Sequence, residues 1–230
     1  MYVKDGVLKW VSSYDINEDG TFKFPEGIKE IGEKAFHFCY SLKEIEIPYG
    51  IEIIGNKAFK NCTDLKKIII PNTVSKIGEE AFSRCYNLKK IIIPDSVEFI
   101  DKAAFSFCKN LKSVIISGSI SEIAESTFAC CTKLKKVILH NAVKEIDSYA
   151  FYRCKSLKKI NLPDSINYIR AYAFNNCTKL KKIIVPDSIH SIDFSDFQKY
   201  RLININENKL YTSDIIFNNN PILKSGRKIS

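Results

Sequence analysis

The chain is poor in several residues on which binding sites and scaffolds often depend. Its 230 residues include one Trp, one Met, three His and nine Gly. No apolar run approaches the roughly 18 residues that a membrane-spanning helix needs, so we expect no transmembrane segment. Residues 1–14 mix Lys4, Asp5 and Lys9 among apolar residues, which argues against a signal peptide. The hydrophobic fraction of 45% excludes wholesale disorder.

Residues that carry catalysis or bind metals are equally scarce. His37, His140 and His190 fall in different positions of the chain, and no His and Cys share a metal-ligand spacing. A glycine-rich phosphate loop and a nucleophile motif are also missing from the sequence. The sequence therefore predicts no catalytic site, no metal and no cofactor, and a protein that is not an enzyme.

Cysteine and positive charge, in contrast, are abundant. The chain has eight Cys, and 35 Lys and Arg against 26 Asp and Glu give it a net charge of +9. An even number of cysteines is typical of a disulfide scaffold, although such scaffolds are usually short secreted chains. The spacing of the cysteines has to decide between a scaffold and another role.

A 23-residue repeat governs that spacing. Eight Phe recur at this interval without an insertion, and an Ala precedes six of them. A Cys follows three positions later and a Leu three positions after that, so seven of the eight cysteines belong to the repeat and Cys130 does not. The three columns are Phe36, Phe59, Phe82, Phe105, Phe128, Phe151, Phe174 and Phe197; Cys39, Cys62, Cys85, Cys108, Cys131, Cys154 and Cys177; and Leu42, Leu65, Leu88, Leu111, Leu134, Leu157 and Leu180.

One repeat shows how each unit should fold. Leu88, Ile91 and Ile93 alternate as the inward residues of a strand do, and Pro94 ends the strand because it lacks an N–H. Residues 101–108 contain Ala-Ala-Phe and are predicted to form one or two helical turns. One such unit is too small to fold alone, whereas stacked units share a core and form a parallel sheet.

The repeat also gives the cysteines a role. Each column cysteine is expected to be a small buried hydrophobe in the reduced state, since an odd-numbered column cannot pair off. Reduced thiols favour a reducing compartment. Cys130, beside Cys131, is expected to face outward as an accessible, reactive thiol.

The repeat resembles a known family. Ile-Ile-Ile-Pro-Asp-Ser-Val at 91–97 and Ile-Gly-Glu-Glu-Ala-Phe-Ser-Arg-Cys at 77–85 are similar to the BspA-like leucine-rich repeats, also called the Treponema pallidum type, and the similarity runs from about residue 22 to 197. It implies an α/β leucine-rich repeat solenoid of about eight repeats, curved and right-handed, with a parallel concave sheet and short helical turns on the convex side. It also implies surface and secreted proteins that bind other macromolecules.

Three segments follow from the repeat boundaries. Residues 1–20 lack the columns and are expected to form an N-terminal cap that includes a strand at 7–11. Residues 21–199 carry the repeats. Residues 200–230 are expected to form a C-terminal cap hairpin, with strands at 209–212 and 215–217, followed by a tail.

Two neighbouring columns after the leucine hold twelve Lys and one Glu, a net charge of +11, so the remaining 216 residues sum to −2. Leucine-rich repeat geometry places these columns on the outside of the sheet, beside a third column that is mostly isoleucine. The columns are Lys43, Lys66, Lys89, Lys112, Lys135, Lys158 and Lys181; Glu44, Lys67, Lys90, Ser113, Lys136, Lys159 and Lys182; and Glu46, Ile69, Ile92, Ile115, Ile138, Asn161 and Ile184.

This face has two interpretations. The residues could simply favour strands and keep the sheet soluble, or they could bind an acidic protein, an acidic glycan or an anionic membrane surface. Nucleic acid is disfavoured, because isoleucines and not aromatic rings flank the lysines. A second candidate surface joins Tyr149, Tyr152, Tyr168 and Tyr172 to Arg153 and Arg170.

Taken together, these residues predict a non-enzymatic protein-binding or adhesion module that uses the concave face. The alternative is a structural protein that associates with itself, although a monomer is favoured. Family resemblance favours the cell surface or secretion, whereas unpaired cysteines and the lack of a signal peptide favour the cytoplasm.

Overall fold

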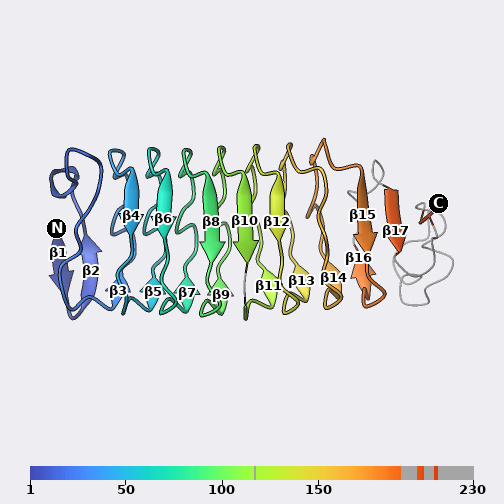
Figure 1. Ribbon diagram of the computed structural model, residues 1–230, viewed down its shortest axis with the longest axis horizontal. Coiled ribbons are helices and arrows are strands. Elements are labelled where there is room, and N and C mark those ends of the chain that lie inside the picture. The colour runs from blue at the N-terminus through green and yellow to red at the C-terminus, as the bar shows by residue number, and fades with distance from the viewer. Residues whose placement is uncertain (117, 193–200, 205–209, 212–230) are drawn as a thin grey trace, which may run out of the picture.

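The repeats stack as coils along the long axis of the molecule (Figure 1). The computed structural model describes residues 1–116, 118–192, 201–204 and 210–211. Each 23-residue repeat contributes one coil, and equivalent residues of neighbouring coils pair in register, as between Val114 and Val137. The predicted repeat solenoid with parallel strands is therefore confirmed.

One side of the solenoid carries the longer strands, which follow the leucine of each repeat as predicted. They pair in parallel, so that Ile115 lies between Ile92 and Ile138. In the coil that lacks a strand, Asn161 still bridges to Ile184. These strands are β4 (Glu44–Glu46), β6 (Lys67–Ile69), β8 (Lys90–Ile93), β10 (Ser113–Ile116), β12 (Lys136–Ile138) and β15 (Lys182–Val185).

A second parallel ladder of two-residue strands forms another side of the coils. These strands contain the isoleucine that lies five residues before each Phe, such as Ile100 before Phe105, and sequence reasoning had not assigned them as strands. They are β3 (Glu30–Ile31), β5 (Ile53–Ile54), β7 (Lys76–Ile77), β9 (Phe99–Ile100), β11 (Glu122–Ile123), β13 (Glu145–Ile146), β14 (Tyr168–Ile169) and β16 (Ser191–Ile192).

The N-terminal residues begin this ladder. Strand β2 (Val7–Trp10) falls where a strand was predicted and pairs in parallel with β3. Strand β1 (Tyr2–Lys4) pairs antiparallel with β2. The ladder therefore opens with a hairpin.

The corner between the two ladders forms hydrogen-bonded turns where short helical turns were expected. Among the described residues the one helix is the 3-10 helix η1 (Ser13–Asp15). In the predicted helical segment, Ala103 and Phe107 have left-handed φ angles of 54° and 59°. The N–H groups of Ala103, Phe105 and Phe107 donate to carbonyls of the next coil, and those of the residues between them donate three residues back. Alternate amides thus leave the coil, so no α-helix can propagate.

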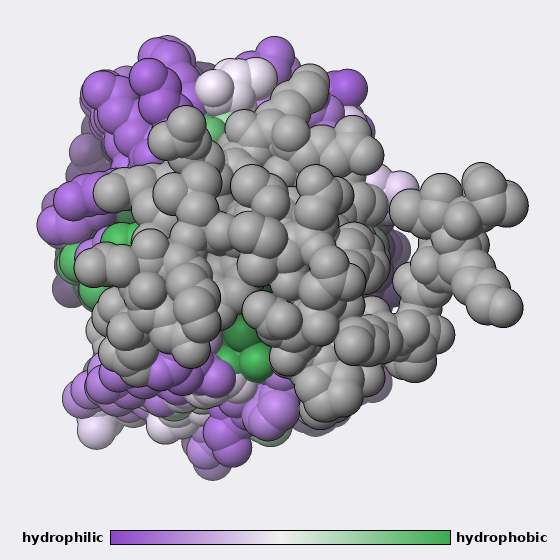
Figure 2. All heavy atoms as spheres, turned by 90° about the vertical axis from the view of Figure 1, so that its right-hand side faces the viewer, coloured by the Kyte–Doolittle hydropathy of each residue, from purple (hydrophilic) through white to green (hydrophobic). Residues whose placement is uncertain are grey.

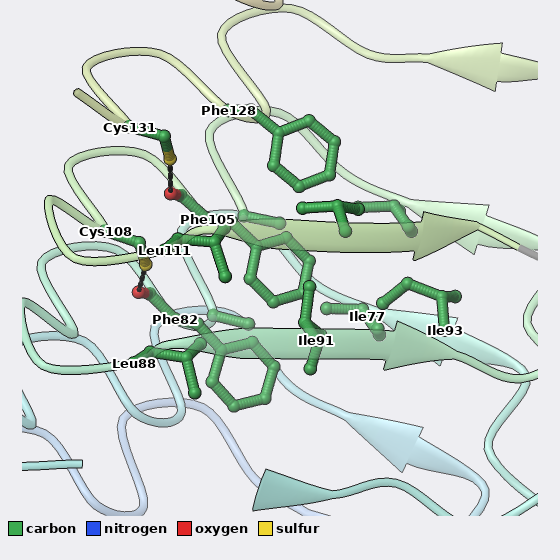
Figure 3. Close-up of a cluster of buried hydrophobic side chains, with 14 of the residues drawn as sticks. Ile77, Phe82, Leu88, Ile91, Ile93, Phe105, Cys108, Leu111, Phe128 and Cys131 are labelled. Carbon is green, nitrogen blue, oxygen red and sulfur yellow. Dashed lines mark hydrogen bonds between the residues drawn. The ribbon is translucent and has the colours of Figure 1, made fainter. Parts of the chain in front are cut away.

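The core lies between the ladders and the corner. Phe82, Phe105 and Phe128 stack with ring centroids 5.1 and 5.6 Å apart and nearly parallel planes (Figure 3). The Cys108 thiol donates to the carbonyl of Phe82, 3.2 Å away, and the other column thiols from Cys62 to Cys177 repeat this contact. Each column cysteine is buried and reduced, as predicted, and those from Cys62 to Cys177 also donate to a phenylalanine carbonyl of the preceding coil.

The expectation that Cys130 faces outward is wrong. Its side chain is 9% exposed, and burial raises the pKa of its thiol, although Arg153, Lys109 and Lys155 act in the opposite direction. The backbone at Cys130 is left-handed, with φ of 60°, and its N–H donates to the carbonyl of Tyr152. The equivalent left-handed residues Phe107 and Arg153 are exposed, so the burial of Cys130 is particular to its own coil.

A further parallel strand follows the last regular coil. Strand β17 (Arg201–Asn204) pairs with β15, and Arg201 lies opposite Lys182 although the two are 19 residues apart in the sequence. Strand β18 (Leu210–Tyr211) then pairs antiparallel with β17. The predicted strand at 209–212 contains β18, β17 was not predicted, and the predicted strand at 215–217 lies outside the described residues.

Candidate binding surface

The two lysine columns lie on the outer surface of the longer strands, where they were predicted. We call the described members of these columns with exposed side chains the lysine face. Lys43, at the N-terminal end, is half-buried because its N–H and stem lie against Gly20. At the C-terminal end, the backbone of Lys182 continues the column. The lysine face comprises Lys66, Lys67, Lys89, Lys90, Lys112, Lys135, Lys136, Lys158, Lys159 and Lys181.

These lysines have few anionic neighbours. Lys67 Nζ lies 4.0 Å from a Glu44 carboxylate oxygen, and within the described part of the chain no other lysine of this face forms an ion pair. Elsewhere on the described surface several cations are paired: Lys60 contacts Glu80, Lys102 contacts Glu79 and Arg170 contacts Glu145. Cations on the lysine face therefore remain available to an anion from outside.

An apolar stripe borders the lysine face. Ile69, Ile92, Ile138 and Ile184 are 41%, 49%, 41% and 36% exposed. Ile115 is half-buried, so the stripe exposes less apolar surface in its middle. Glu46 and Asn161 interrupt it toward its two ends. The predicted stripe thus exists but is less continuous than the sequence suggested.

The tyrosine surface divides into two groups. Tyr149 stacks on Tyr172 with centroids 5.1 Å apart and meets Tyr152 edge to face, while Arg153 lies 5.0 Å above the Tyr152 ring. On the short-strand side, Arg170 lies 5.2 Å above the Tyr168 ring, next to His190. Rings in both groups contact other side chains of this protein, which leaves less of their faces free for a partner.

Six cations beside the lysine face form a group that sequence reasoning did not identify, although it named Arg153 with the tyrosines. They lie on the corner turns, two to five residues after the phenylalanine of the repeat, and all are exposed. The sequence does contain a signal for them, because acidic residues are missing from these turns in successive repeats. That signal is not visible when one repeat position is compared at a time. We call them the basic corner: Arg84, Lys109, Lys133, Arg153, Lys155 and Lys179.

The view along the axis from the C-terminal end shows the described outer residues as mostly hydrophilic, with small hydrophobic areas between them (Figure 2). Within the described residues, no group of three or more His, Cys, Asp or Glu side chains could hold a metal ion. In the same part of the chain, no helix is long and apolar enough to cross a membrane. The surface features left to explain are therefore the lysines, the isoleucines and the aromatic rings.

Stacked coils of this kind, with a parallel ladder of strands after a leucine, define a leucine-rich repeat protein. Residues 19–135 and 121–225 match the BspA type leucine rich repeat region, in six copies. The chain belongs to this family.

Solved structures agree with that assignment. A leucine rich cell surface protein from Faecalibacterium prausnitzii is 31% identical with a TM-score of 0.63, over 73% of this chain and 51% of that one. A leucine-rich repeat protein from Bacteroides ovatus is 30% identical with a TM-score of 0.55, over 77% and 55%. The Treponema pallidum leucine rich repeat protein is 27% identical with a TM-score of 0.52, over 75% and 69%.

This chain spans about half the length of the Faecalibacterium and Bacteroides proteins. Among curated proteins no sequence matches. The family and these neighbours are repeat proteins and not known enzymes, and they support a repeat-based binding module.

Proposed function

We propose that this protein is a non-enzymatic binding module whose lysine face holds an anionic partner. The observation that supports it most is the row of exposed lysines next to exposed isoleucines, in which Lys67 alone forms an ion pair within the described residues. Like charges one strand spacing apart, about 4.8 Å, repel one another. An anion relieves that repulsion, and the apolar stripe adds contact area.

The setting we propose is adhesion at a cell surface. The Faecalibacterium neighbour is described as a cell surface protein, and this chain shares 31% of its residues with it over the matched region. Anionic polymers and acidic proteins are abundant at cell surfaces, so a basic strand face would meet suitable partners there.

Charge reversal on the lysine face tests the proposal. The substitutions Lys89→Glu, Lys112→Glu, Lys135→Glu and Lys158→Glu affect exposed side chains in four consecutive coils. We expect the variant to lose retention on a sulfated-polysaccharide column while its circular dichroism stays that of the wild type, because these side chains do not contribute to the core.

A matched control reverses Lys29, Lys76, Lys102 and Lys144, which are exposed and lie on or beside the short strands. It changes the net charge equally and should keep most of the retention. Equal loss in both variants would mean that net charge alone governs binding. Unchanged retention in the first variant would mean that the lysines only keep the protein soluble and do not bind a partner.

Self-association is the second candidate, because Ile69, Ile92 and Ile138 form an exposed apolar row on neighbouring strands. Light scattering on the same wild-type sample separates the two candidates. A mass of 26.3 kDa across concentrations supports the first one, and a concentration-dependent dimer that Ile92→Lys abolishes supports the second.

A further inference from the structure

The corner turns and the strand starts that follow them form one uninterrupted basic surface. In five consecutive coils, the eight residues after each phenylalanine contain 15 Lys and Arg and no Asp or Glu. Nine of these cations belong to the predicted lysine columns and six form the basic corner. The five segments are residues 83–90, 106–113, 129–136, 152–159 and 175–182.

Acidic residues gather on the other ladder. In the eight residues that end just before each phenylalanine, from residue 51 to 173, nine Asp and Glu stand against five Lys and Arg. Glu122 lies close enough to Asp147 and Glu145 that, together with burial, they raise the pKa of its carboxyl. The molecule therefore has a basic side and an acidic side, which orients an approaching polyanion toward the corner.

Aromatic rings hold the corner cations in place. Arg84 lies 5.5 Å from the ring centre of Phe107, Lys109 lies 4.7 Å from that of Tyr86, and Arg153 lies 5.0 Å from that of Tyr152. Lys133 Nζ donates to the Asn110 side chain at 2.8 Å. No corner cation forms an ion pair within the described residues. These charges are thus positioned without being neutralised.

The positions of the charges are linear and periodic. Backbone hydrogen bonds between coils, such as Phe107 N–H to the Ala129 carbonyl at 2.7 Å, fix each corner one coil from the next. Coils one strand spacing apart, about 4.8 Å, spread five sets of cations over about 19 Å. One coil is close to the length of one sugar residue along an extended glycan. Acid groups on successive or alternate sugars would therefore meet a cation in each coil that they reach.

We propose that the anionic partner is an unbranched acidic polysaccharide, sulfated or uronic-acid-rich, that lies along the solenoid axis over the basic corner and the lysine face. This inference deepens the proposed function and depends on it. The corner cations and the lysine face contact the acid groups from two sides, while the isoleucines beside the lysine face offer apolar surface to the sugar rings.

Two other polyanions fit this surface less well. Bases of a single-stranded nucleic acid need free aromatic faces in succession, but cations cover faces of Phe107, Tyr86 and Tyr152. An acidic globular protein presents charges on a curved and irregular surface, which would not follow five evenly spaced coils.

The test compares size-fractionated heparin oligosaccharides, desulfated heparin of the same lengths, oligo-dT and polyglutamate as ligands for the full chain. We expect affinity for the sulfated oligosaccharides to rise with length until they cover about 19 Å. Desulfated chains should bind at least about tenfold more weakly, and log affinity should fall linearly with log salt concentration. Tighter binding of oligo-dT or polyglutamate at equal charge would overturn the choice of polysaccharide.

Variants separate this inference from the proposed function. Replacing Arg84, Lys109, Arg153 and Lys155 with Gln should weaken heparin binding at least about tenfold and flatten the salt dependence. The control replaces Lys29, Lys76, Lys102 and Lys144 with Gln and should have little effect. If the corner variant binds heparin as the wild type does while the lysine-face variant does not, the corner inference is wrong and the proposed function stands. If neither variant loses binding, both are wrong.

Discussion

In the corner turns, fourteen residues, two in each of seven coils, have left-handed backbone angles, and none of these is a glycine. They lie two positions before and two positions after each phenylalanine, as Ala103 and Phe107 do around Phe105. A residue with a Cβ in this conformation costs about 1–2 kcal/mol. This cost is offset in the first six of these coils, because each left-handed residue donates its N–H to a carbonyl of the next coil.

Glycine at such a position should therefore stabilise the fold. Ala103→Gly, at φ of 54°, should raise the free energy of unfolding by about 0.5–1 kcal/mol, since relief of strain exceeds the entropy gained by the unfolded chain. Ala124→Gly is a matched control at a half-buried alanine without a positive φ and should lower it by a similar amount. Urea titration measures both. Destabilisation of the first variant would show that the corner is not strained.

At the scale of the element, the corner and the cysteine column work together. Each phenylalanine carbonyl accepts the N–H of the cysteine three residues on and the thiol of the cysteine in the next coil, as Phe82 does with Cys85 and Cys108. Burial raises the pKa of Cys39 to about 11 and of Cys108 to about 12. The thiols are therefore neutral donors at any physiological pH and weak nucleophiles in the native state.

Those raised pKa values make the fold sensitive to alkali. An unfolded thiol ionises near pH 9 but a native one does not, so the native state loses stability as pH rises from about 9 toward 11–12. We expect the free energy of unfolding to fall between pH 8 and 10.5. In a Cys39→Ala, Cys108→Ala variant the fall should be smaller by about 4 kcal/mol, about 2 kcal/mol for each thiol removed. Equal falls in the two proteins would contradict the assignment of these pKa values.

Thiol labelling offers an independent check on the same elements. At pH 8 a soluble disulfide reagent should react slowly with the native chain, and all eight thiols should react in urea. Rapid reaction of one thiol in the native chain would instead support the prediction from sequence that Cys130 is accessible and reactive.

Local spacing predicted the columns correctly but not the corner. Phe36, Cys39 and Leu42 are spaced by three, which also suits a helix, and Ala-Ala-Phe at 103–105 has strong helix propensity. The choice between a helix and left-handed turns depends on amides that bond to a different coil, which no window within one repeat contains. The burial of Cys130 was missed for the same reason, whereas the lysine face was predicted from the outward positions of leucine-rich repeat geometry.

At the scale of the molecule, each coil contacts chiefly its two neighbours, so stability is a sum of coil and interface terms. The phenylalanine stack runs from Phe36 to Phe174 with centroid spacings between 4.7 and 5.6 Å. Phe105 lies near its middle and is completely buried. Loss of the Phe105 ring therefore removes its stacking contacts with the rings of both neighbouring coils.

Phe105→Ala should lower the free energy of unfolding by about 3–5 kcal/mol and uncouple the two halves of the solenoid. The one tryptophan, Trp10, lies in the N-terminal hairpin, so its fluorescence reports on that end while circular dichroism reports on all coils. We expect the two urea transitions to coincide in the wild type and to separate in the variant. Phe107→Ala, an exposed position two residues on, is the control and should leave them together. Coincident transitions in Phe105→Ala would argue against one-dimensional coupling.

The left-handed corner residues also bear on how such a protein can evolve. Their fourteen positions hold nine kinds of residue within one chain, whereas the seven cysteines of the neighbouring column do not vary at all. All of them but Cys130 lie at least partly at the surface, so mutations at these corners change what the surface displays while the core columns stay the same. Duplication of a coil followed by drift at its corner would give a lineage new specificities from a scaffold that it already makes.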